Sequence, residues 1–197
     1  MSKRTMFICF GCTMVVGAAA LGLRTAAAGD PRATIVMAAA TALGDADDCV
    51  WDQADPNNPS RSSGADCLLG IANEAFGGAA PASVRSAVTQ KGPRDGGHWC
   101  GMFALGAIKQ GVPTVGNWVV GSGISSVAGM RQITRAQLGP GDVCYLGGPF
   151  QHHALVVEVN GPTGAFTTIE GNADCNGHAS TICEKSHTSC ANYYSAF

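Results

Sequence analysis

The spacing of the apolar residues changes partway along the chain, and this change constrains the fold more than any other feature. Between residues 66 and 110, apolar side chains recur every three or four positions, which is typical of amphipathic helices. After the turn Gly139-Pro140-Gly141-Asp142 they form short runs separated by Gly and Asn-Gly, which is typical of antiparallel strands. Helices followed by strands predict an α+β fold.

The same spacings predict the individual elements. We expect helices over residues 66–76, 81–91 and 99–110, and either a short helix or a soft N-terminal segment over 32–43. We expect strands over residues 143–146, 154–159, 166–169, 180–183 and 193–197. The length of 197 residues suits about one domain, which we place at residues 66–197, after an N-terminal segment and polar linker at 29–65.

The first 28 residues have the composition of a secretory signal peptide. The basic run Ser2-Lys3-Arg4 precedes an uncharged, mostly apolar stretch from Met6 to Leu23, and Ala26-Ala27-Ala28 supplies small residues for cleavage near Gly29. The alternative is an uncleaved membrane anchor, because the apolar stretch is close to a spanning length. The favoured interpretation predicts a secreted or periplasmic protein.

Charge excludes one class of partner. Three of the 12 basic residues (Lys3, Arg4 and Arg24) lie within the first 28, so the rest of the chain has 9 basic and 14 acidic residues. A domain with a net charge of −5 offers no basic surface on which nucleic-acid phosphates could bind. We therefore expect no nucleic-acid partner.

The stretch between Gly44 and Gly64 is acidic and polar. Its Asp45-Ala46-Asp47 spacing is similar to the start of a calcium-binding loop. However, the sixth position of that loop is Val50 instead of Gly, and the twelfth is Pro56 instead of Glu. A solvated acidic turn is the favoured interpretation, and no metal site is expected here.

If the protein is exported, its cysteines can form disulfides. Seven remain after the first 28 residues, and in an oxidising compartment six of them could form three disulfides. They are Cys49, Cys67, Cys100, Cys144, Cys175, Cys183 and Cys190. Six cysteines allow 15 pairings, and the sequence does not choose among them. The odd cysteine is either an intermolecular bridge or a reactive thiol.

Cys100 has the features of a nucleophilic cysteine. The glycine-rich loop 92–97 leads to it, and it lies at the predicted start of a helix, where the helix dipole stabilises a thiolate. The pair His152-His153 opens a later predicted strand, and the next strand ends in Glu170-Gly171-Asn172. A thiol, an imidazole and a group that orients the imidazole are what nucleophilic catalysis requires.

The other histidines are weaker candidates. His98 is too close to Cys100 in the loop to be a natural base, and His178 and His187 lie in polar segments, where we expect solvated side chains. The Cys183, His187 and Cys190 cluster is better explained by disulfides and surface than by zinc, so neither a metal nor a cofactor is expected.

Four motifs together resemble one family. They are Trp99-Cys100-Gly101-Met102-Phe103, Leu138-Gly-Pro-Gly-Asp142-Val143, His153-Ala-Leu-Val-Val157 and Ile169-Glu170-Gly-Asn172. In this order and with these gaps, residues 66–197 resemble the CHAP family of cysteine, histidine-dependent amidohydrolases and peptidases, within the NlpC-type, papain-like group. The resemblance implies helices packed on a small antiparallel sheet and a secreted enzyme that cleaves peptidoglycan.

The resemblance also implies roles for individual residues. Cys100 would be the nucleophile and His153 the base, because the family's histidine directly precedes a small residue and an aliphatic run. Glu170 and Asn172 would orient the histidine or line the oxyanion region. Neighbouring strand residues point to opposite faces, so only one of the two adjacent histidines is expected to face Cys100, and His152 would be a partly exposed neighbour.

One feature departs from the pattern of papain-like enzymes, and the resemblance leaves the bond that is cut undetermined. Residues 94–99 contain no glutamine that could act as the oxyanion donor of papain-like enzymes, so the backbone N–H of Cys100 and another donor would have to serve. The sequence does not decide whether the enzyme would be an N-acetylmuramoyl-L-alanine amidase or a stem-peptide endopeptidase.

Two other functions remain as alternatives. One is a disulfide-stabilised exported binding protein on the same fold, with Cys100 paired and catalysis lost. The other is a papain-like peptidase acting on protein, because a catalytic triad does not name its substrate. For the enzyme we expect three disulfides that exclude Cys100, with Cys49 bound to Cys67 and Cys144 bound to one of the three later cysteines.

Overall fold

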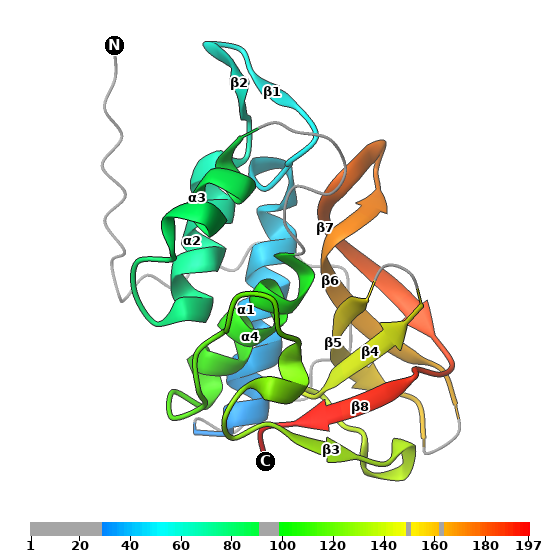
Figure 1. The fold of residues 1–197 in the computed structure, drawn as a ribbon. Coiled ribbons are helices and arrows are strands. Elements are labelled where there is room, and N and C mark those ends of the chain that lie inside the picture. The colour runs from blue at the N-terminus through cyan, green and yellow to red at the C-terminus, as the bar shows by residue number, and fades with distance from the viewer. Residues whose placement is uncertain (1–28, 91–98, 149–150, 162–163) are drawn as a thin grey trace.

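Helices come first along the chain and an antiparallel sheet follows them, as Figure 1 shows. The computed structural model describes residues 29–90, 99–148, 151–161 and 164–197. The α-helices are α1 (Pro31–Gly44), α2 (Ala65–Phe76), α3 (Ala82–Thr89) and α4 (Trp99–Gly111), and the 3-10 turns are η1 (Ala46–Asp48), η2 (Ile124–Ser126) and η3 (Arg135–Gln137). The strands are β1 (Ala54–Asp55), β2 (Asn58–Ser62), β3 (Arg131–Ile133), β4 (Val143–Gly147), β5 (His152–Val159), β6 (Phe166–Cys175), β7 (His178–His187) and β8 (Asn192–Ser195).

These elements confirm the predicted α+β class. Each predicted helix and strand is present, and α1 resolves the open choice over residues 32–43 in favour of a helix. The Asp30 side chain accepts a hydrogen bond from the backbone N–H of Arg32, which caps the start of α1. Gly77, with a φ of 65°, ends α2 in the left-handed conformation that glycine adopts most easily.

The larger sheet has six strands in the order β3-β8-β4-β5-β6-β7, and neighbouring strands are antiparallel. Strand β8 therefore lies between β3 and β4, although it comes last in the sequence. The pairing of β4 with β5 is regular at Cys144 and Ala154, but it shifts between Tyr145 and Gly147, opposite the first residues of β5. This irregularity lies beside the two adjacent histidines.

The main core lies between the helices and one face of the sheet, where α4 packs on β5 and β6 (Figure 1). Leu105 and Ile108 of α4 and Leu155 and Ile169 of the sheet are fully or almost fully buried there. A second apolar cluster lies on the other face of the sheet. Its buried members are Ile133, Leu138, Cys144, Ala154, Val156 and Phe166.

The N-terminal segment belongs to the same packing unit as the rest of the chain, which differs from the expected linker at residues 29–65. Ile35 of α1 and Trp51 are buried in the main core, and the Trp51 backbone N–H donates to the carbonyl of Ser180 in β7. The short hairpin β1–β2 also lies in this stretch. Asp45 and Asp47 are exposed, as expected for a solvated acidic turn, but Cys49, Val50 and Trp51 of the same stretch are buried.

The predicted disulfides are confirmed. Cys49 is bound to Cys67, Cys144 to Cys190, and Cys175 to Cys183, whereas the thiol of Cys100 is unpaired and buried. Among the described residues, no helix is both long and apolar enough to cross a membrane. The predicted signal peptide at residues 1–28 lies outside the described residues.

Candidate active site

Cys100 is the second residue of α4 and is only 1% exposed. The residues around it in this helix are almost all buried, because α4 packs between α1, α2 and the sheet. At the N-terminus of a helix the backbone dipole favours a negative charge, as predicted for this thiol. The preceding glycine-rich loop and His98 lie outside the described residues.

Gly101 allows the first turn of α4 to approach two aromatic rings closely. A Cβ atom at this position would lie 2.3 Å from the ring of Trp118 and 3.2 Å from Nδ1 of His153. The Trp118 ring stands edge-on to the His153 ring, with centroids 5.9 Å apart and an interplanar angle of 87°. Glycine therefore lets the helix, the indole and the imidazole meet at one point.

His153 contacts Cys100 directly, as predicted. Its Nδ1 lies 3.8 Å from Sγ of Cys100, and its Nε2 accepts a hydrogen bond from the backbone N–H of Ile124 at 3.4 Å. Its side chain is almost fully covered, since the residue is 7% exposed and packs against the rings of Trp118 and Tyr145.

The thiol of Cys100 is acidic. Burial alone would raise its pKa, but hydrogen bonds to His152 and His153 and the charges of these imidazoles lower the pKa from 9.0 to about 6. At neutral pH the thiol is therefore ionised, which is the form that attacks carbonyl carbon.

The two adjacent histidines have different partners, as expected: the thiol of Cys100 contacts His153, whereas His152 binds Glu170. Strand alternation separates neighbouring side chains within a regular strand. His152 is the first residue of β5, the register with β4 shifts beside it, and Gln151 before it has a φ of 44°. The backbone is thus irregular where the two side chains diverge.

Glu170 binds His152 and not His153, which corrects the expected contact. Its Oε2 lies 2.8 Å from Nε2 of His152, while its Oε1 accepts hydrogen bonds from Nε2 of His187 at 2.5 Å and from Oγ1 of Thr168 at 2.6 Å. Burial would raise the pKa of this carboxyl, which is 1% exposed, but these three donors hold it well below its usual range.

His178 and His187 are only partly solvated, which modifies the expectation for them. The side chain of each is 19% exposed, and each has an acidic neighbour: Asp52 for His178 and Glu170 for His187. Because antiparallel pairing places His187 opposite Phe166, it shares a face of the sheet with Thr168 and Glu170. The polar sequence around His187 gave no indication of this contact.

Asn172 does not orient His153 either. Its Oδ1 accepts a hydrogen bond from Oγ of Ser180 at 2.5 Å, and this oxygen in turn accepts one from Nε1 of Trp99 at 3.3 Å. Asn172 has a φ of 59°, in the left-handed region that asparagine tolerates better than most residues. Asn172 therefore helps to fix the residue that precedes the thiol.

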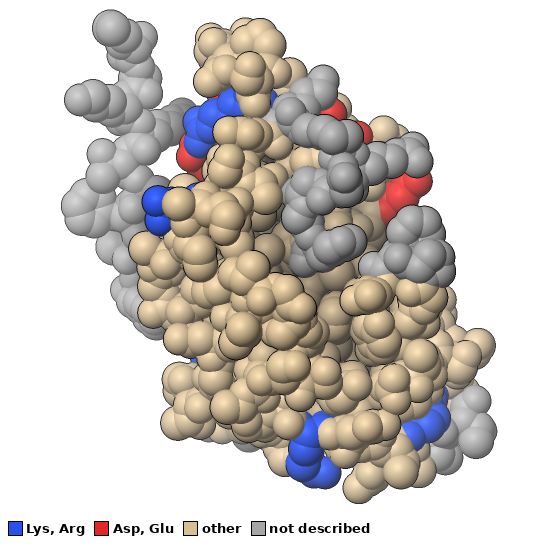
Figure 2. Space-filling model, in the orientation of Figure 1, with Lys and Arg blue, Asp and Glu red and all other residues tan. Residues whose placement is uncertain are grey.

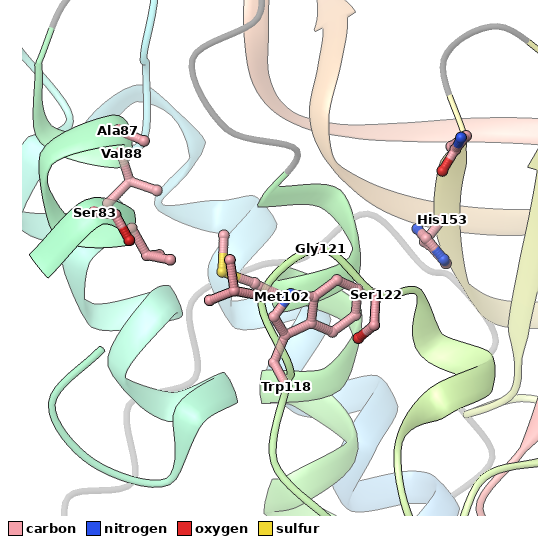
Figure 3. Close-up of a pocket in the computed structure, with 11 residues that line it drawn as sticks. Ser83, Ala87, Val88, Met102, Trp118, Gly121, Ser122 and His153 are labelled. Atoms are coloured by element: carbon pink, nitrogen blue, oxygen red, sulfur yellow. The ribbon is translucent and has the colours of Figure 1, made fainter. Parts of the chain in front are cut away.

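A pocket of about 410 Å³ opens beside His153 (Figure 3). Ser83, Ala87 and Val88 of α3 form one wall and His153 lies on the opposite side, with Met102 and Trp118 between them. The remaining lining residues are Val84, Val120, Gly121, Ser122 and Gln151. All described lining residues other than His153 are uncharged, and on the face in Figure 2 the visible charged side chains are few and scattered.

Within the part of the chain that the structure describes, no group of three or more His, Cys, Asp or Glu side chains is arranged to hold a metal ion. Comparison of the chain with family models, with curated proteins and with solved structures finds no match.

Proposed function

We propose that this protein is a secreted cysteine hydrolase that cleaves amide bonds in peptidoglycan, with Cys100 as its nucleophile. The observation that carries the proposal is the unpaired, buried thiol of Cys100 at the start of α4, in contact with the imidazole of His153. A thiol whose pKa is lowered by a histidine is the usual nucleophile of cysteine hydrolases.

The chemistry would proceed in two halves. The thiolate attacks the carbonyl carbon of the amide, and the C–N bond breaks to release an amine and leave a thioester on Cys100. Water then hydrolyses the thioester and restores the thiolate. His153 moves the proton in both halves, and the backbone N–H of Cys100, in the first turn of α4, can stabilise the oxyanion.

The order of the elements supports a papain-like fold of the CHAP type. The thiol lies at the start of α4, the adjacent histidines open β5, and Glu170 lies in the neighbouring β6, on which α4 also packs. These are the positions that the resemblance implies for the nucleophile, the base and the polar partner. The contact between Glu170 and His152 in place of His153 is this chain's own feature.

Peptidoglycan is proposed as substrate because of the same resemblance. The three disulfides are compatible with an extracellular protein, and the signal-like composition of residues 1–28 supports export. The unpaired thiol also favours an enzyme over a binding protein, for which Cys100 would be in a disulfide.

A peptidase acting on protein is the second candidate, and the pocket favours it. Val84, Val88, Met102 and Trp118 form an apolar wall that would suit an apolar side chain of a peptide substrate.

Digestion of purified peptidoglycan and of denatured casein would decide between these substrates. We expect new amino groups from peptidoglycan and none from casein, and mass spectrometry of the released fragments would separate amidase from endopeptidase. The Cys100→Ser variant is the matched control and should release nothing. Release from casein alone would favour the second candidate, and release from neither substrate would contradict both.

A further inference from the structure

Two residues of β6, Gly171 and Asn172, hold the start of α4. A Cβ atom at Gly171 would lie 2.5 Å from the ring of Trp99, so the helix and the strand approach closely because this residue has no side chain. Asn172 accepts a hydrogen bond from Ser180, which in turn accepts one from the indole N–H of Trp99. Trp99 directly precedes Cys100 in α4, so the position of the thiol depends on this part of β6.

The preceding residue of β6, Glu170, holds the start of β5. Among the described residues, the backbone pairing of β5 with β6 ends at Leu155 and Ile169, so His152 and His153 lie beyond it. The side chain of Glu170 reaches across instead, and its Oε2 lies 2.8 Å from Nε2 of His152. On the side of β6, this side-chain contact is therefore what ties down the backbone that carries His153.

The other edge of β5 gives its start only irregular support. The register of β5 with β4 shifts between Tyr145 and Gly147, which pair with His153 and His152. Strand ends with little regular pairing open more easily than the middle of a sheet. Without the contact between Glu170 and His152, we therefore expect His153 to move relative to the thiol.

The carboxylate of Glu170 is fixed from its other side by β6 and β7. Because side chains alternate along a strand, Glu170 and His152 share the face of the sheet that is turned away from α4. The second oxygen of Glu170 accepts hydrogen bonds from His187 of β7 and from Thr168 of β6. Glu170 is only 1% exposed, so water competes little for either oxygen. The carboxylate can therefore hold His152 at one position.

We propose that residues 170–172 of β6 set the distance between the thiol of Cys100 and the imidazole of His153. In this role His152 and His187 are positioning residues, which act through the carboxylate and the backbone of β5. The proposal rests on the proposed function, in which Cys100 is the nucleophile. The family resemblance implies that the carboxylate orients the catalytic histidine itself, whereas here it acts through the neighbouring residue.

The ionisation of Cys100 reports this distance. Its Sγ lies 3.8 Å from Nδ1 of His153. A hydrogen bond from an imidazole stabilises the thiolate and lowers the pKa of the thiol, and the attraction weakens as the two groups move apart. Any loosening of His153 should therefore raise the pKa of Cys100.

The test measures this ionisation without any substrate. The ultraviolet absorbance of the thiolate is recorded against pH for the full chain with its disulfides intact. The trace of the same chain with Cys100→Ser is subtracted, so that only Cys100 contributes. In the wild type the midpoint should lie near pH 6.

Two substitutions of His152 separate its position from its charge. Both His152→Ala and His152→Gln remove an imidazole whose charge helps to lower the pKa of Cys100, so both midpoints should rise. Only alanine also loses the contact with Glu170, because the glutamine amide can place a donor near the position of Nε2. The midpoint in His152→Ala should therefore lie about one pH unit above that in His152→Gln.

His187 tests the same arrangement from further away. His187→Ala frees one side of Glu170 and should raise the midpoint of Cys100 by about half a pH unit. His178→Ala is the matched control, since the side chain of His178 in β7 is equally exposed but lies beside Asp52. This control should leave the midpoint unchanged.

Equal midpoints in the two His152 variants would overturn the proposal, because position would then contribute nothing. If circular dichroism shows that either His152 variant does not fold, the His187 pair decides, and equal midpoints in His187→Ala and His178→Ala would overturn it. Because the ionisation of Cys100 needs no substrate, failure to cleave peptidoglycan would refute the proposed function and leave this positioning role intact.

Discussion

The ring of Trp118 lies against Gly101, in the first turn of α4, where even a methyl group would overlap it. The backbone N–H of Trp118 donates to the carbonyl of Ala75 in α2 at 3.0 Å, which ties the segment after α4 to a neighbouring helix. The indole also stands edge-on to His153. Trp118 therefore covers the residues next to the thiol and excludes water from one side of the site.

We expect Gly101→Ala to displace Trp118 or α4. A shift of about 1 Å at a catalytic group can lower the rate about 100-fold, and overpacking of this kind costs about 1–3 kcal/mol of stability. Steady-state hydrolysis and thermal unfolding would measure both effects. Gly70→Ala in α2 is the control, because a Cβ there meets no atom within 4 Å and alanine favours the helix. Wild-type hydrolysis by Gly101→Ala would contradict the role given to this contact.

Cys100→Ser should abolish hydrolysis and leave folding nearly unchanged. Serine is close to cysteine in volume, but its hydroxyl has a far higher pKa and is not ionised by the imidazoles. Product release and circular dichroism of the variant, beside the wild type, would measure the two effects. A variant that hydrolyses at the wild-type rate would rule out a cysteine mechanism.

The pH dependence of kcat/KM should have an acid limb near pH 6. Cys100 has a lowered pKa of about 6, so activity should fall as the pH drops through 6 and the thiolate gains a proton. An acid limb near pH 8.5 would show that the thiol is not activated.

Removal of the Cys144–Cys190 disulfide should lower stability more than removal of Cys175–Cys183. The sequence separations are 46 and 8 residues, and loop-closure entropy then gives about 4 and about 2.5 kcal/mol. Paired Cys→Ala variants and denaturant unfolding would measure the difference. Both variants should still hydrolyse substrate below their melting temperatures, since neither bridge includes Cys100. Equal losses of stability would argue against the entropic explanation.

The sequence predicted the elements well because their local patterns were strong. The helix before Gly77 and the strand that begins near Ala154 have clear spacing and clear end signals, and both are confirmed. The strand β3, with only three residues, was not predicted, because its pairing with β8 depends on distant residues. The burial of Trp51 was missed for the same reason, since its core contacts come from elsewhere in the chain.

The site could be predicted only in part. Cys100 and His153 are brought together as expected, because a thiol at a helix start and a histidine at a strand start are local features. The contact of Glu170 with His152 depends on the register between two strands: because Leu155 pairs with Ile169, Glu170 shares a face with Ala154 and His152 and not with His153. The position of His187 could have been found from the Asn176-Gly177 turn, because an antiparallel hairpin around that turn places His187 opposite Phe166.

The position of β8 between β3 and β4 has a consequence for the order of folding. Cys144 of β4 pairs with Tyr193 of β8, so the middle of the sheet joins residues that are far apart in the sequence, and such contacts form slowly. The hairpin β6–β7, which holds Glu170 and His187, is local and can form early. Cys190 lies just before β8. The rate at which the Cys144–Cys190 disulfide forms during refolding would therefore report how fast β8 pairs with β4 and closes the sheet.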